Sequence, residues 1–208
     1  MKSRYYKNYF KSIENGLNLS LYKINSIDVN PFKFFNDIKF LLKKIRTEKN
    51  KIFLFGNGAS ASFANHMALD FSKNGNILSK SLSDNAMLSA LSNDFSYEEA
   101  MVEFLKIEKV DSHDLIITIS SSGNSSNIIN VLNYCKLNKI KTFSLSGLKK
   151  DNKSINISDY SIYVPMKTYG IVECIHQIFL HLILDESMGI KEWDKKDYQN
   201  MNSKYYNL

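Results

Sequence analysis

Cysteine, proline and tryptophan are scarce in this sequence, and so are long apolar runs. The chain has two cysteines, two prolines and one tryptophan among 208 residues. Cys135 and Cys174 form no CxxC spacing and each falls within a predicted helix, so we expect buried, reduced thiols rather than a disulfide or a thiolate zinc site. The apolar runs are only as long as strands, and the first residues lack the apolar core of a signal peptide. We therefore expect a cytoplasmic protein that neither crosses nor enters a membrane.

Arginine is scarcer still, although the chain is basic. Arg4 and Arg46 are the only arginines, and the formal net charge is +6. The lysines are spread widely, with local clusters at 42–51, 149–153 and 191–196, and no basic motif is interleaved with aromatic residues. We therefore expect no nucleic-acid partner. A bound phosphate would have to be held by backbone N–H groups and hydroxyls, because no guanidinium lies near the loops described next.

A loop rich in Gly, Ser and Asn occurs twice, at 51–71 and at 115–135. In each copy an apolar run leads into small polar residues and then into an amphipathic stretch, which predicts strand, turn and helix. The first N–H groups of such a helix lack partners and carry the positive end of its dipole, so they can bind a phosphate. Each loop alone is compatible with an ordinary turn, but the pair favours a phosphate site. Neither contains G-x-G-x-x-G or a Walker lysine, which argues against a nucleotide.

The order of the predicted elements indicates an α/β fold. Two helices, at 4–22 and 31–49, precede the first strand. The predicted strands are 51–55, 77–82, 115–119, 141–145 and 160–164, and the helices among them are 60–73, 86–92, 97–107, 125–137 and 171–188. Strands separated by helices pair in parallel, which predicts a three-layer αβα sandwich around a mostly parallel five-stranded sheet. We expect one domain, with a helical pair at 1–49, the core at 50–188 and a polar tail at 189–208.

At these loops the chain resembles the sugar isomerase (SIS) domain family and, within it, the phosphoheptose isomerases. The matching segments follow the family order from about residue 50 to 188. They are GNGAS at 56–60, the helix with His66 and Asp70, SNDF at 92–95, ISSSGNS at 119–125 and ECIHQIFLH at 173–181. The resemblance implies a flavodoxin-like SIS fold, a homotetramer with active sites between subunits, and aldose–ketose isomerisation of a heptose phosphate for surface polysaccharide. The substrate-binding residues that we expect are Asn57, Gly58, Ser60, Asn93, Asp94, Ser120, Ser121, Ser122 and Ser125.

The ionisable residues supply acid–base or metal chemistry. His66 and Asp70 lie four residues apart on one face of a predicted helix, a spacing that suits two ligands of one metal or a plain surface hydrogen bond. Glu173 and His181 are eight residues apart, so their Cα atoms would be about 12 Å apart on one straight helix. One ion could hardly bind both from a regular helix of one chain, so either Glu173 lies at an irregular helix start or the site combines residues of different subunits. The resemblance implies Asp70 and His181 as catalytic residues and zinc held by His66, Asp70, Glu173 and His181. We also expect Glu173 to be catalytic, as an extra carboxylate that either tightens metal binding or acts as the displaced base.

Two histidines receive no catalytic role: we expect His176 to pack in the core or beside the site and His113 to lie on the surface. Several positions also depart from the family pattern, which has Glu, Arg, Asp and Gln where this chain has Asp70, Asn74, Gly170 and Glu173. These departures bear on the choice of sugar more than on the reaction class. Two alternatives stay open: a non-catalytic SIS module that binds a sugar phosphate or a protein partner, and a different SIS enzyme such as an amidosugar isomerase or amino-sugar lyase.

Overall fold

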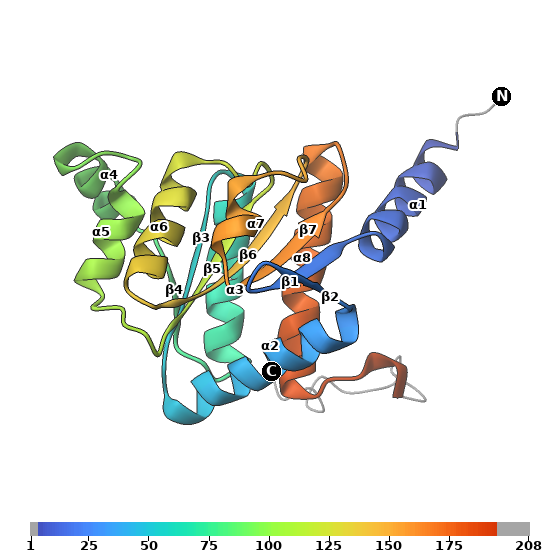
Figure 1. Ribbon diagram of the computed structural model, residues 1–208, viewed down its shortest axis with the longest axis horizontal. Helices are drawn as coiled ribbons and strands as arrows, with labels where there is room; N and C mark the ends of the chain where they lie inside the picture. The colour runs from blue at the N-terminus through green and yellow to red at the C-terminus, as the bar shows by residue number, and fades with distance from the viewer. Residues whose placement is uncertain (1–3, 195–208) are drawn as a thin grey trace.

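Five apolar runs of the chain form the parallel strands of a central sheet. A computed structural model of the protein describes residues 4–194 (Figure 1). The parallel strands are β3 (Ile52–Gly56), β4 (Ser79–Ser81), β5 (Leu115–Ser120), β6 (Lys141–Gly147) and β7 (Tyr160–Val164). They lie in the order β7-β6-β5-β3-β4, and every residue of β3 and β5 is buried. Continuous apolar runs are typical of strands covered on both faces, so the predicted parallel core is confirmed.

The sheet has seven strands rather than the predicted five. The additional strands β1 (Leu21–Ile24) and β2 (Ile27–Val29) form a hairpin, and β1 pairs antiparallel with β7. The first helix, α1 (Tyr5–Asn18), is correspondingly shorter than the predicted 4–22. Asn25 and Ser26 make the turn with φ of 50° and 67°, as a tight two-residue hairpin requires. The prediction was wrong because a four-residue strand is stabilised by its partner β7, far away in the sequence, and not by a local pattern.

Helices cover both faces of the sheet, which confirms the αβα sandwich. One face carries α2 (Pro31–Glu48), α3 (Ala59–Lys73) and α8 (Tyr169–Met188), and the other carries α4 (Asn85–Asp94), α5 (Ala100–Ile107) and α6 (Ser126–Leu137). Alternate residues of β3 pack into the two cores, Ile52 and Leu54 into one and Phe53 and Phe55 into the other. A short helix, α7 (Lys153–Ile157), was not predicted from the sequence and packs beside α6.

Helix α1 projects away from the sheet and packs only partly on the rest of the fold (Figure 1). It contacts α8, but Tyr5, Tyr6 and Phe10 are 72%, 58% and 65% exposed. None of the helices in residues 4–194 is both long enough and apolar enough to cross a membrane. A 3-10 helix, Glu192–Asp194, begins the predicted polar tail, and the remainder of that tail, 195–208, lies outside the described residues.

Candidate active site

The two Gly/Ser loops line one small pocket at the carboxyl ends of β3 and β5. These strands are neighbours in the sheet, so the loops that follow them emerge side by side. The pocket has a volume of about 120 Å³. It is lined by Asn57, Ser60, Ile119, Ser120, Ser121, Ser122, Ser125, Tyr169 and Glu173. We call it the serine pocket; it contains six of the nine residues expected to bind substrate.

Glycine shapes the first loop at two positions. A Cβ on Gly56 would lie 2.5 Å from the carbonyl of Ser60, so only glycine lets the chain fold back this closely. Gly58 precedes the first residue of α3 with φ of 56° and ψ of −125°, a conformation that other residues avoid. No side chain caps the start of α3. The positive end of the α3 dipole therefore lies at this loop, where the N–H groups of Ser60, Ala61 and Ser62 donate to the carbonyls of Asn57 and Gly58.

Asn57 is held in place by a reciprocal pair of amide hydrogen bonds. Its Nδ2 donates to Asn127 Oδ1 at 3.0 Å, and Asn127 Nδ2 donates to Asn57 Oδ1 at 2.8 Å. The Tyr97 hydroxyl donates to the same Asn57 oxygen at 2.9 Å. Because Asn127 lies in the first turn of α6, these bonds tie the first loop to the helix that follows the second loop. The two loops are thus fixed relative to each other before a ligand binds.

The second loop offers hydroxyls that the protein itself does not use. Ser121 Oγ is buried and has no hydrogen-bond partner among the described residues. Ser125 stands at the N-cap of α6, yet its side chain makes no capping hydrogen bond. A buried hydroxyl without a partner costs about 1–3 kcal/mol. No lysine or arginine within residues 4–194 lines the serine pocket, so an anion there would be held mainly by hydroxyls and helix dipoles.

A second group of residues lies on the facing helices α3 and α8. His66 Nε2 is 3.1 Å from Asp70 Oδ2, one turn along α3. The His66 and His181 rings are 5.3 Å apart, and one potential ligand atom from each of His66, Asp70 and His181 lies within 4.8 Å of the others. We call this group the histidine cluster. Two imidazoles and a carboxylate are a donor set that suits zinc.

Gln177 and Asp185 extend the histidine cluster along α8. Gln177 Nε2 lies 2.8 Å from His181 Nε2, while Gln177 Oε1 is buried and has no partner among the described residues. Burial raises the pKa of the Asp185 carboxyl; the nearby Asp70 carboxylate raises it further, and His181 lowers it. The Gln177 amide oxygen and the Asp185 carboxyl therefore lie beside the histidine cluster, and sequence reasoning missed both. Their spacing of four residues from His181 was the available signal.

Other expected residues lie apart from these two groups. Glu173 lines the serine pocket and is not part of the histidine cluster within the described chain. Asn93 and Asp94 are exposed at the end of α4, where Asn93 Nδ2 donates to Asp94 Oδ1. His113 is exposed, as expected. His176 is buried against Ser146, whose carbonyl oxygen is 3.1 Å from its Nε2, which fits the packing role.

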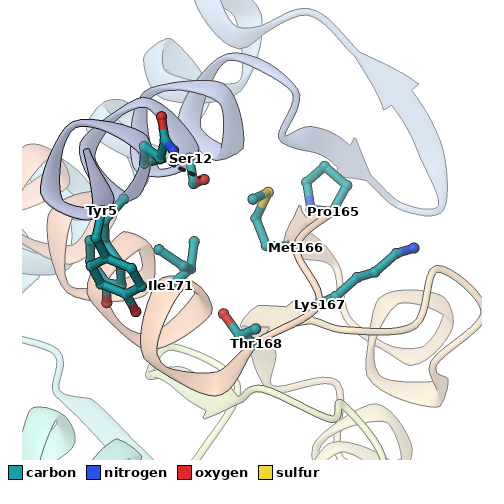
Figure 2. A pocket seen from close by; sticks show the side chains of 9 residues that line it. Tyr5, Ser12, Pro165, Met166, Lys167, Thr168 and Ile171 are labelled. Atoms are coloured by element: carbon teal, nitrogen blue, oxygen red, sulfur yellow. Dashed lines mark hydrogen bonds between the residues drawn. The ribbon is translucent and has the colours of Figure 1, made fainter. Parts of the chain in front are cut away.

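A larger groove of about 470 Å³ separates α1 from the start of α8 (Figure 2). Figure 2 shows Tyr5 and Ser12 on one side and Met166, Lys167 and Thr168 on the other. None of the described residues that line the groove is a His, Cys, Asp or Glu, which separates it from the serine pocket and the histidine cluster.

Comparison with known proteins agrees with this arrangement. The SIS domain family model matches residues 37–147, and the chain belongs to the SIS domain family. Within it, the chain is 32% identical over 151 residues to the phosphoheptose isomerase of Helicobacter pylori strain Shi470, covering 70% of this chain and 78% of that protein. It is 36% identical over 140 residues to the phosphoheptose isomerase of Aneurinibacillus thermoaerophilus, covering 64% and 70%. The family resemblance seen in the sequence is confirmed.

A solved structure shows the same fold. The phosphoheptose isomerase from Neisseria gonorrhoeae superposes with a TM-score of 0.75 at 19% identity, covering 88% of this chain and 94% of that chain. The superposition covers more of the chain than the sequence alignments do, because packing is maintained where sequence has diverged.

Proposed function

We propose that the protein is a phosphosugar isomerase that interconverts an aldose and a ketose phosphate through an enediol. The preferred reaction is sedoheptulose 7-phosphate to D-glycero-D-manno-heptose 7-phosphate, which makes a precursor of surface polysaccharide. The observation that carries the proposal is the single pocket formed by both Gly/Ser loops, with proton-transfer groups on the two helices α3 and α8. The similarity to phosphoheptose isomerases supports the same reaction class.

The serine pocket would bind the phosphate. Ser60, Ser120, Ser121, Ser122 and Ser125 would contribute hydroxyls, and the starts of α3 and α6 would contribute the positive ends of their helix dipoles. Asn57 and Gly58 would hold the loop against the substrate, and Asn93 and Asp94 would reach it only if another subunit or a movement of α4 brings them closer. A sugar phosphate carries charge that an apolar membrane excludes, so we place the reaction in the cytoplasm.

The isomerisation would move a proton between C1 and C2 of the open-chain sugar. Asp70 or Glu173 would accept the proton from carbon, and His181 would exchange protons with the sugar oxygens. Asp70 and His181 lie in the histidine cluster, farther along the helices than the serine pocket. This separation suits a substrate whose phosphate is several carbons away from its carbonyl group.

Zinc fits the histidine cluster. The ligand atoms of His66, Asp70 and His181 lie within 4.8 Å of one another, and the buried Gln177 Oε1 lacks a partner in the described chain. A zinc ion held there would supply Lewis-acid chemistry to the sugar carbonyl. The proposed ligands are His66, Asp70 and His181, with Glu173 as a fourth if another subunit supplies it.

We also propose a homotetramer. The exposed aromatic residues of α1 and the groove between α1 and α8 (Figure 2) are the features that support a subunit interface. An apolar patch rimmed by polar residues is typical of such surfaces. Light scattering of the purified protein measures the subunit number, and a monomer that retains full activity would contradict this part of the proposal.

Incubation with sedoheptulose 7-phosphate in heavy water tests the proposed reaction. We expect deuterium to enter at C2 of the aldose product, as followed by NMR, and His181→Ala to slow the exchange by about 10²–10⁴-fold. A parallel sample with chelator tests the metal, because chelator-insensitive exchange would remove it from the mechanism. Absence of exchange with every ketose phosphate offered would contradict the proposal and favour a binding module.

A further inference from the structure

Asn152 is a buried polar side chain that the proposed function does not use. It is fully buried, and its Nδ2 donates to the Lys149 carbonyl at 2.7 Å and to Ser146 Oγ at 3.2 Å. Its Oδ1 accepts from the Ser154 hydroxyl at 2.8 Å and from the Ile155 N–H at 3.4 Å. An asparagine amide has two donors and one oxygen with two lone pairs, so its whole hydrogen-bonding capacity is used. The side chain is therefore a fixed point between the end of β6 and the start of α7.

The second Gly/Ser loop packs directly against this fixed point. Gly123 has a φ of 61°, and a Cβ at this position would collide with Oδ1 and Cγ of Asn152. The backbone that follows Asn152 also donates to the loop. The Ser154 N–H donates to the Gly123 carbonyl at 3.0 Å, and the Lys153 N–H donates to Asn124 Oδ1 at 2.9 Å. Close packing and two hydrogen bonds thus set the position of the loop at Gly123 and Asn124.

The hydroxyls of this loop line the serine pocket. The Gly123 N–H donates to the Ser120 carbonyl at 2.9 Å and closes a turn that carries Ser121 and Ser122. The loop residues that line the pocket precede and follow Gly123: Ser120, Ser121, Ser122 and Ser125. Asn152 is not among the described residues that line the pocket. It can therefore act on a ligand there only through the loop that it supports.

We propose that Asn152 is a positioning residue for phosphate binding: it holds Gly123 and Asn124 in place, and through them the serine hydroxyls. This inference rests on the proposed function, which assigns the phosphate to the serine pocket. A displaced loop would misplace several hydroxyls at once, so the loss should appear in binding. Proton transfer belongs to the histidine cluster on α3 and α8, so kcat should change little while KM rises.

Asn152→Ser and a matched change in the same helix, Asn156→Ser at an exposed position, test the proposal. Serine can still cap the helix, but it lacks the amide that contacts Gly123 and donates to Ser146. Calorimetry measures binding of inorganic phosphate, and deuterium exchange with sedoheptulose 7-phosphate gives KM and kcat. We expect Asn152→Ser to weaken phosphate binding and raise KM, each by about tenfold, with kcat within about twofold of wild type. Asn156→Ser should match wild type, and thermal melting of both variants checks the fold.

A double-variant cycle tests the contact itself. Gly123→Ala alone places a Cβ against Asn152, whereas the same Cβ has more room beside Asn152→Ser. We expect Gly123→Ala to reduce phosphate affinity less in the Asn152→Ser background than in wild type, by about threefold or more. Equal reductions in the two backgrounds would overturn the proposal. Wild-type phosphate affinity in Asn152→Ser would overturn it too, as would a fall in kcat at unchanged KM.

Ser154→Ala replaces Asn152→Ser if that variant does not fold. It removes one of the four hydrogen bonds of the Asn152 amide, so we expect phosphate binding to be about twofold to threefold weaker, and unchanged affinity would overturn the proposal. A wild-type protein that binds phosphate without deuterium exchange would contradict the isomerase proposal alone, and the affinities would still decide the role of Asn152. A wild-type protein that binds no phosphate would overturn both.

Discussion

The serine pocket and the histidine cluster are built by different means. The serine pocket consists of backbone and short hydroxyls at the ends of two adjacent strands, so its shape follows from the sheet. The histidine cluster consists of side chains on two helices that meet only because both pack on the same face of the sheet. In the proposed function, the first region binds the phosphate and the second supplies proton transfer and metal ligands. Substitutions should therefore separate binding from chemistry.

The largest expected effect is on chemistry at the cluster. His181→Ala should lower the deuterium exchange rate by about 10²–10⁴-fold, the usual contribution of a positioned acid or base. Binding of inorganic phosphate, measured by calorimetry, should stay close to wild type because the serine pocket is untouched. His113→Ala, at an exposed position, is the control. If His181→Ala lost phosphate binding as strongly as it loses deuterium exchange, the serine pocket and the histidine cluster would be one structural unit.

A second prediction contrasts two histidines on α8. Burial lowers the pKa of His176 to about 4, against an ordinary value of 6.5. Between these values the unfolded chain binds more protons than the native chain, so stability is lost as the pH falls from about 6.5 to about 4. The free energy of unfolding should drop by about 3 kcal/mol through this residue. Urea unfolding at several pH values across this range measures the free energy of unfolding. His176→Gln should reduce its dependence on pH, whereas His181→Gln should leave that dependence unchanged.

A third prediction tests the close approach in the first loop. Gly56→Ala places a Cβ 2.5 Å from the Ser60 carbonyl, so we expect a loss of about 1–3 kcal/mol in stability together with weaker phosphate binding. Gly58→Ala meets no atom within 4 Å, and its cost of about 1–2 kcal/mol comes from positive φ alone. Thermal melting and phosphate titration of both variants compare the effect of the close contact at Gly56 with the effect of positive φ at Gly58. Unchanged melting of Gly56→Ala would show that the loop can open.

The smallest effect is the most selective one. Ser121→Ala removes a buried hydroxyl that has no partner in the described chain, so the free protein should gain up to about 1 kcal/mol in stability. The same change should raise KM for the sugar phosphate several-fold, since the hydroxyl is kept for the ligand. Thermal melting tests the expected gain in stability, and steady-state kinetics test the expected rise in KM. A loss of stability would mean that Ser121 serves the fold and not the site.

Much of the sheet could be predicted because parallel strands buried on both faces are continuous apolar runs. The strands at 52–56 and 115–120 and their following loops match the sequence prediction closely. The hairpin at 21–29 could not be predicted, since its strands gain stability from pairing with β7 rather than from local pattern. The site divided in the same way: the serines followed from the loops, while Tyr97, Tyr169 and Asp185 were missed.

The sequence by itself determined the two Gly/Ser loops, because glycine, serine and helix-start chemistry act over a few adjacent residues. It also determined the family. Only the tertiary structure decided that both loops share one pocket, that His66 and Asp70 lie close to His181, and that Glu173 lines the serine pocket rather than the histidine cluster of the described residues. The physical reason is that loop conformation is local, whereas the distance between two helices is set by the core that packs between them.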